Sequence, residues 1–153
     1  MKEIGIADIW DKEKTDSLSS FIVSRSKQQS KERLLRNELL SIRFQIEDYI
    51  ESEENPEKLE LLDFVKMYLK AFNITQKRLA ELFEMKDSNL HKYLVGERKL
   101  NTSLLLKLSS FSRLNPEYWL RIEIRNELIE INKQLNDSYS KYDYLNLLVT
   151  SEG

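Results

Sequence analysis

The chain has 153 residues, a third of them charged, with three glycines and two prolines. This composition favours helices joined by short loops over a sandwich or barrel. Cysteine is absent, which excludes disulfides, thiolate metal sites and thiol nucleophiles. The first ten residues hold no apolar run, and no run of about eighteen apolar residues occurs, so we expect neither a signal peptide nor a membrane span, and a cytoplasmic protein.

The first third of the chain is expected to be an extension. Residues 1–16 have isolated apolar side chains without a period, which is typical of an arm that either docks Trp10 on the body or orders on a partner. Residues 18–23 can form a short helix or strand and residues 24–30 a connection. Ser30 then caps a helix over residues 31–51. Its apolar stripe either packs on the domain or binds a partner protein or a second copy: Leu35, Leu39, Ile42, Ile46 and Tyr49.

The clearest boundary is the acidic segment that ends in Asn55-Pro56-Glu57. A cap residue, a proline and an acid in this order predict a helix that starts at Pro56 and runs to about Phe72. We therefore divide the chain into an arm and helical extension (1–54), a helical domain (55–135) and a tail (136–153). The tail is too apolar to be a free end and too short to classify.

Residues 74–101 have the pattern of two short helices joined by a turn of about four residues. Thr75 can cap the first helix, and the small Ala80 allows a close crossing. Gly96 can end the second helix. The first helix is expected to bury Leu79, Ala80, Leu82 and Phe83, and the second to bury Leu90, Tyr93 and Leu94. Four polar residues of the second helix stay outside: Ser88, Asn89, His91 and Lys92.

Two more helices are expected after this pair. Asn101 can cap one through Phe111, with Leu104, Leu105 and Leu108 inside. Asn115-Pro116 predicts the start of a long helix to about residue 135, on the order of 30 Å. Its start should close the core, and its remainder offers a stripe for a dimer or another partner: Leu120, Ile124, Leu128, Ile131 and Leu135.

These motifs resemble a known family. The Thr-Gln-x-x-Leu-Ala spacing from Thr75, the apolar Leu90 and the turn at residues 96–99 resemble the λ-repressor-like (XRE-type) helix-turn-helix family, whose five-helix domain is all-α. Residues 115–120 and 126–128 resemble the end of the HigA-type antitoxin domain. Together the resemblance covers roughly residues 59–135. Glu84 stands where the family usually has a turn glycine, which implies a strained or reshaped turn. Lys86 replaces the usual hydroxyl cap and leaves Asp87 to offset the helix dipole.

The resemblance and the dimensions of the major groove together indicate DNA contacts. An α-helix fits this groove, so the outward residues early on the second helix are expected to contact bases: Asp87, Ser88, Asn89 and Lys92. By similarity to the family, Gln76, Arg98, Lys99 and Asn101 should contact backbone phosphate. His91 is either a further phosphate contact or a solvated surface histidine.

Charge is distributed unevenly although the net charge is only −2. Residues 73–103 hold six basic and four acidic side chains, whereas residues 1–60 hold fourteen acidic and ten basic ones. The small basic surplus therefore coincides with the helix-turn-helix. Phosphate neutralisation must then depend on placement and on dimerisation.

No glycine-rich phosphate loop, nucleophile elbow or metal-spaced cluster is found, so we expect no enzyme, cofactor or metal site. The sequence predicts a homodimeric transcriptional regulator that binds a palindromic operator on duplex DNA and is nucleoid-associated when bound. By the resemblance, it is the antitoxin of a RelE/HigB-like ribonuclease, which the acidic extension would bind through Ile6, Ile9 and Trp10. The alternatives are a stand-alone regulator without a toxin and a partner-binding module that has lost DNA binding.

Overall fold

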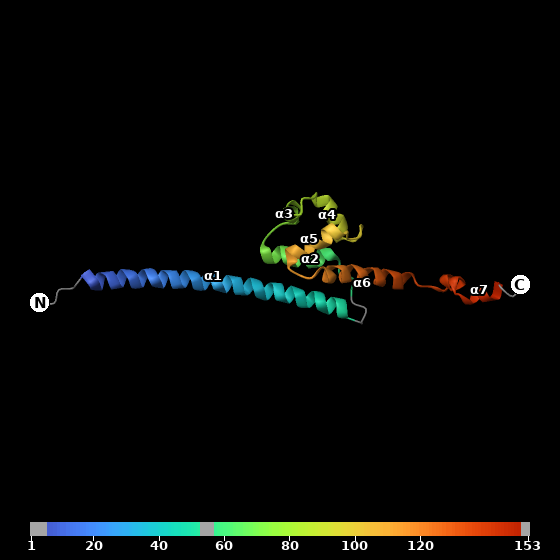
Figure 1. Cartoon of the computed structure of the whole chain (residues 1–153), viewed down its shortest axis with the longest axis horizontal. Helices are drawn as coiled ribbons and strands as arrows, with labels where there is room; N and C mark the ends of the chain where they lie inside the picture. The colour runs from blue at the N-terminus through green and yellow to red at the C-terminus, as the bar shows by residue number, and fades with distance from the viewer. Residues whose placement is uncertain (1–5, 53–56, 151–153) are drawn as a thin grey trace. The chain divides into compact units, whose positions relative to one another are not determined.

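The computed structural model describes residues 6–52 and 57–150, with side chains from residue 12 to residue 149, and every regular element in these ranges is a helix (Figure 1). The predicted all-α class with a helical N-terminal extension is confirmed. The chain divides into two units, Met1–Ile42 and Arg43–Gly153. No helix of the described ranges combines the length and apolarity that a membrane span needs. The elements are α1 (Ile6–Glu51), α2 (Leu61–Phe72), α3 (Gln76–Leu82), α4 (Asp87–Leu94), α5 (Thr102–Ser112), α6 (Pro116–Gln134), the 3-10 helix η1 (Asp137–Tyr142) and α7 (Leu145–Thr150).

Helix α1 differs most from the expectation. The arm, the short element and the connection predicted for residues 1–30 are wrong from Ile6 onward, because one helix of 46 residues runs from Ile6 to Glu51. No glycine or proline interrupts these residues, so serines and a weak apolar pattern did not mark a break. Ser30 lies inside the helix and caps nothing. Burial rises along the predicted stripe, from the half-buried Leu35 and Leu39 to three buried residues: Ile42, Ile46 and Tyr49.

Helix α2 begins at Leu61, five residues later than predicted. The Asn55-Pro56 signal lies outside the described residues. Glu60 is the N-cap and forms a reciprocal capping box with Asp63. The residue before it is held by distant side chains, since the Leu59 N–H donates to the Tyr49 hydroxyl (3.0 Å) and its carbonyl accepts from Asn126 (2.8 Å). These tertiary contacts keep the segment before α2 out of the helix.

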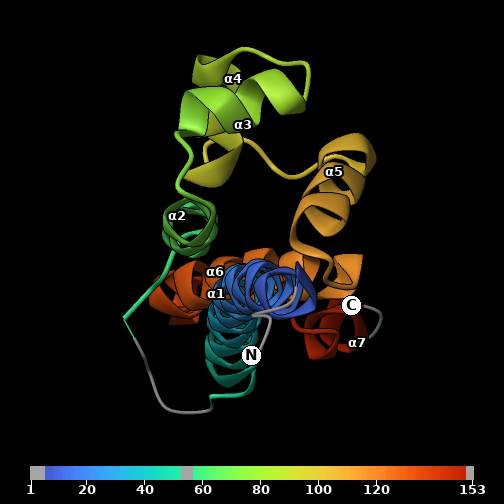
Figure 2. The same ribbon diagram turned by 90° about the vertical axis from the view of Figure 1, so that its left-hand side faces the viewer.

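The core of the second unit lies where α2, α5 and α6 meet. In Figure 2, α3 and α4 lie at one end of this unit, and α2 and α5 lie between them and α6. Tyr68 is buried 5.9 Å from the Phe111 ring and 6.0 Å from the Trp119 ring, measured between centroids. Burial raises the pKa of Tyr68 to about 12. The Trp119 indole N–H donates to the buried Ser112 hydroxyl (2.9 Å), which itself donates to the Leu108 carbonyl (2.7 Å). The Trp119 indole and the Ser112 hydroxyl are thus both paired within this core.

Three of the predicted caps are confirmed. Thr75, Asn101 and Asn115 each accept a backbone N–H through the side chain, at the start of α3, α5 and α6. Three core assignments are wrong: Leu82 is 65% exposed, and Tyr93 and Leu105 are only half-buried. The short α3 buries only Leu79 and Ala80 within its length. After α6, the described part of the tail forms η1 and α7, and its side chains to residue 149 are exposed.

Candidate nucleic-acid interface

Helices α3 and α4 pack together across a turn of four residues. Ala80 is buried at the crossing, and its carbonyl accepts the Met85 N–H (3.0 Å). Leu90 and Leu94 are fully buried and fix the inner face of α4. The two-helix arrangement predicted from residues 74–101 is therefore present, with its second helix anchored by apolar side chains.

The turn between these helices is strained at Glu84. This residue has a φ of 57°, in the left-handed region that disfavours residues with a Cβ. The prediction that an acidic residue in place of a turn glycine would strain the turn is thus confirmed. Lys107 of α5 stabilises the same turn, since its ammonium group donates to the Phe83 carbonyl (2.5 Å). A cation at the C-terminal end of α3 also interacts favourably with the negative end of the helix dipole.

The start of α4 is held by a side-chain contact rather than by a hydroxyl cap. Lys86 is the N-cap residue and makes no side-chain cap bond, while Asp87 lies in the first turn, as predicted. The Gln76 amide nitrogen donates to Asp87 Oδ1 (2.8 Å) and lies 3.5 Å from His91 Nδ1. The structure thus brings together one predicted phosphate contact, one predicted base contact and the single histidine of the chain.

The polar face of α4 contains the other predicted base contacts. Ser88 and His91 are exposed, and Asn89 and Lys92 are partly exposed. All four lie on one helix of eight residues whose opposite face is buried. Such a face can enter a major groove without unfolding any part of the core.

The turn after α4 holds three predicted phosphate contacts, and Tyr93 orders two of them. Gly96 has a φ of 83° and follows the end of α4, as predicted. The Arg98 guanidinium lies 5.9 Å from the centre of the Tyr93 ring, and the Asn101 amide donates to the Tyr93 hydroxyl (3.3 Å). Tyr93 was predicted only as a core residue. Its half-buried ring in fact positions side chains that face solvent.

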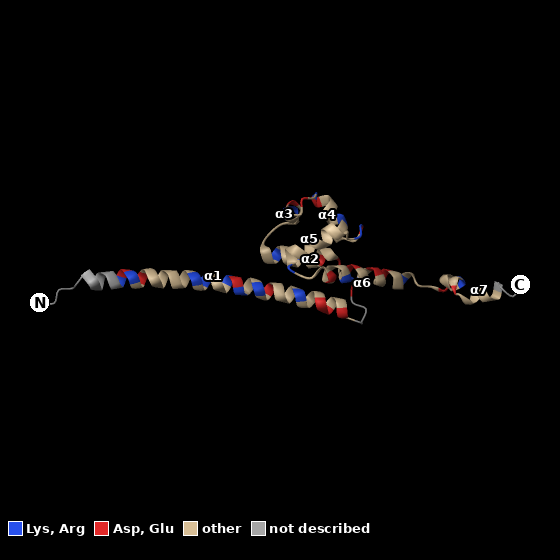
Figure 3. Ribbon diagram, viewed as in Figure 1, with Lys and Arg blue, Asp and Glu red and all other residues tan. Residues whose placement is uncertain are grey.

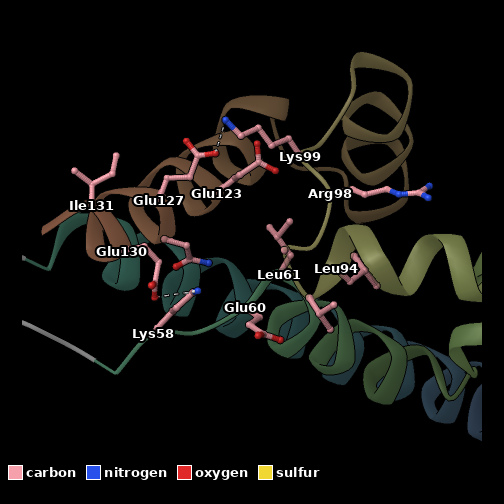
Figure 4. A pocket seen from close by; sticks show the side chains of 13 residues that line it. Lys58, Glu60, Leu61, Leu94, Arg98, Lys99, Glu123, Glu127, Glu130 and Ile131 are labelled. Carbon is pink, nitrogen blue, oxygen red and sulfur yellow. Dashed lines mark hydrogen bonds and ion pairs between the residues drawn. The ribbon is translucent and has the colours of Figure 1, made fainter. Parts of the chain in front are cut away.

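Helix α6 supplies two carboxylates to this turn that the sequence analysis missed. Glu123 accepts the Leu100 N–H (2.7 Å), and burial raises the pKa of this carboxyl group. Glu127 forms an ion pair with Lys99 (3.2 Å), shown as a dashed line in Figure 4. Both glutamates line a groove of about 360 Å³ between the start of α2, the end of α4 and α6. The only sequence feature that connects Glu123 with Glu127 is their i, i+4 spacing, which places them on one face of the helix.

The predicted stripe of α6 lies largely on the outside. Trp119 and Ile122 face the core and are fully buried, whereas the stripe residues are 38–66% exposed: Leu120, Ile124, Leu128, Ile131 and Leu135. The helix therefore has a core face and an apolar outer face, as the sequence analysis expected. The side chains of Ile6, Ile9 and Trp10, predicted to bind a toxin, lie outside the described residues.

Charges of both signs alternate along the helices that Figure 3 colours. On α6, acidic and basic side chains pair within the helix and with other segments, as in the contacts of Glu130 with Lys58 (3.3 Å) and with Lys133 (3.4 Å). Lys58 is the main reason that the pKa of Glu130 lies below its ordinary value. Residues 73–103, which include α3 and α4, hold six basic and four acidic side chains, so contacts with phosphate must come from individual side chains.

The geometry of α3 and α4 agrees with a comparison to known families. Residues 65–119 match the family model described as Helix-turn-helix. The match begins within α2 and ends at Trp119 in α6, so it contains α3, α4 and α5. It covers roughly a third of the chain and supports the helix-turn-helix part of the resemblance, without extending to the HigA-type part. No curated protein and no solved structure matches the chain.

Proposed function

We propose that this protein is a transcriptional regulator that binds duplex DNA sequence-specifically, with α4 in the major groove. The observation that carries the proposal is α4 itself. Leu90 and Leu94 fix its inner face, and its outer face presents Ser88, Asn89 and Lys92 within the segment that matches the helix-turn-helix family. The major groove accepts a helix and shows a distinct donor and acceptor pattern for each base pair.

The contacts to bases follow from the side-chain chemistry. Asn89 can pair with adenine through two hydrogen bonds, and Lys92 can donate to guanine or to a phosphate. Asp87 Oδ1 already accepts from Gln76. In this proposal Asp87 Oδ2 accepts from the amino group of cytosine, and the Gln76 contact fixes the carboxylate for it. A contact of this kind would favour cytosine over bases that present an acceptor at the same place.

We propose further that the protein binds as a two-fold dimer on a palindromic site. One α4 makes few base contacts, and the exposed stripe of α6 from Leu120 to Leu135 provides an apolar face for a second copy. Two α4 helices should then contact half-sites about 34 Å apart, or a multiple of this distance. Sedimentation of the wild type against a Leu128→Glu, Ile131→Glu variant tests the dimer. A monomeric wild type at micromolar concentration refutes it.

DNA binding is tested by fluorescence anisotropy with duplexes selected from random sequence. Arg98→Ala should weaken binding to all duplexes and reduce the salt slope by about one unit, because it removes a phosphate contact. Asn89→Ala should cost about 1–3 kcal/mol, chiefly at one base position. Weak binding that is independent of salt, equal for all duplexes and unchanged by either substitution would show that α4 does not contact DNA.

We propose more specifically that the protein is an antitoxin, and exposed apolar side chains in the N-terminal part of α1 support this role. The side chains of residues 12–34 in α1 are all exposed, and one short segment presents four apolar ones: Leu18, Phe21, Ile22 and Val23. We propose that this part of α1 binds a RelE/HigB-like ribonuclease. A Phe21→Glu, Ile22→Glu variant should lose protection against such a toxin on coexpression while it still binds DNA. Full protection by the variant, or a chromosomal neighbourhood without a toxin gene, favours the stand-alone regulator.

A further inference from the structure

The turn that carries Arg98, Lys99 and Asn101 is fastened to α6 at two neighbouring points. Glu123 accepts the backbone N–H of Leu100 at 2.7 Å. Glu127, one helical turn later, holds the Lys99 ammonium group at 3.2 Å. In Figure 4 the two glutamates lie side by side on α6 and both face this turn. Lys99, a predicted phosphate contact, is therefore already paired with a carboxylate of the same protein.

We propose that Glu127 competes with the DNA backbone for Lys99. In the free protein the Glu127 carboxylate takes the place of a phosphate, and binding to DNA transfers the ammonium group from Glu127 to a phosphate oxygen. The inference rests on the proposed DNA-binding function and adds a residue to it. Glu127 thereby sets the phosphate affinity of the turn, although it lies in the part of α6 that follows Trp119, where the match to the helix-turn-helix family ends.

The two contacts differ in the way that this competition requires. The Glu123 contact engages the backbone and its carboxylate is partly buried, so it fixes the path of the turn in both states. The Glu127 contact joins two side chains in solvent, with 81% of the Lys99 side chain and 42% of the Glu127 side chain exposed. An exposed pair of this kind contributes little to stability. It can therefore open when a phosphate oxygen reaches the same ammonium group.

Binding of a fixed duplex at low salt tests the proposal in a double-mutant cycle. Glu127→Gln should tighten binding by about two- to fivefold, the range of an exposed ion pair. Lys99→Ala should weaken binding. In the Lys99→Ala background, Glu127→Gln should have no further effect, because the ammonium group for which Glu127 and the phosphate compete is absent. Glu130→Gln is the matched control on the same helix: its carboxylate pairs with Lys58, which lies before α2, and with Lys133 of α6. This substitution should leave DNA affinity unchanged when Lys99 is present.

Three outcomes overturn the proposal. If Glu127→Gln tightens binding equally with and without Lys99, Glu127 acts only as a repulsive charge. If Glu127→Gln weakens binding, the carboxylate presents Lys99 to DNA instead of withholding it. If the wild type binds no duplex, both the proposed DNA-binding function and the competition for Lys99 are rejected. If the wild type binds DNA but the effects of Glu127→Gln and Lys99→Ala are additive, only the competition is rejected. Circular dichroism of each variant confirms that the helices are retained.

Discussion

Replacing Glu84 by glycine is expected to stabilise the protein, although the substitution adds no contact. Glu84 has a φ of 57° in the turn between α3 and α4, and a left-handed conformation costs a residue with a Cβ about 1–2 kcal/mol. Glycine removes this strain, but it also increases the conformational entropy of the unfolded chain, which lowers the free energy of unfolding by about 0.4–1 kcal/mol. From the middle of each range, the net gain in the free energy of unfolding should be about 0.8 kcal/mol, which corresponds to a rise in Tm of about 2–3 °C.

Thermal and urea unfolding followed by circular dichroism measure this gain. Glu84→Ala is the matched control, because it removes the carboxylate and keeps the Cβ. If backbone strain is the cause, Glu84→Gly is stabilised and Glu84→Ala is not. Arg113, with a φ of 54° at the end of α5, offers an independent position where glycine should act in the same direction. A glycine variant that is no more stable than wild type, or an alanine variant that gains as much, refutes the reasoning.

Three further substitutions address buried polar contacts. Ser112→Ala should lower the free energy of unfolding by about 1–3 kcal/mol, because it leaves the buried indole N–H of Trp119 unpaired; urea unfolding measures this, and an unchanged midpoint contradicts it. Tyr49→Phe should cost a similar amount, since its hydroxyl pairs with the Asn126 side chain and a backbone N–H; a loss well below about 1 kcal/mol would show that water replaces it. Glu123 has a raised pKa in the folded state, so its contribution favours folding below the ordinary value of 4.5 and is lost as pH rises through the folded value. The free energy of unfolding of Glu123→Gln relative to wild type should therefore increase as pH rises over this window. A difference that stays constant between pH 4 and 7 contradicts this prediction.

The features that the sequence predicted correctly are those determined by residues close together in the chain. Thr75, Asn101 and Asn115 each cap the helix that follows within three residues, so the local pattern contains the whole interaction. The strain at Glu84 was likewise predicted from a single position within a short motif. Local chemistry was sufficient to place α3, α4, α5 and α6.

The features that the sequence analysis missed depend on distant residues. The start of α2 is set by Tyr49 and Asn126, which engage Leu59 from 10 and 67 residues away. The pairing of Lys99 with Glu127 joins two segments that no pattern connects. Helix α1 was divided wrongly for a different reason: its serine-rich part has only a short run of apolar residues at helical spacing, yet contains no residue that would end a helix. The base and phosphate contacts remain predictions that the DNA titrations test.

The burial of Trp119 makes the second unit spectroscopically distinct. Its indole is fully enclosed and lies 6.0 Å from the Tyr68 ring, so its fluorescence should be blue-shifted and should receive energy from that tyrosine. The other tryptophan of the chain, Trp10, belongs to the unit Met1–Ile42. A Trp10→Phe variant therefore leaves one tryptophan, Trp119, in the core of the second unit. The red shift of Trp119 emission on denaturation follows the second unit alone, and the difference between wild-type and variant emission follows the extension.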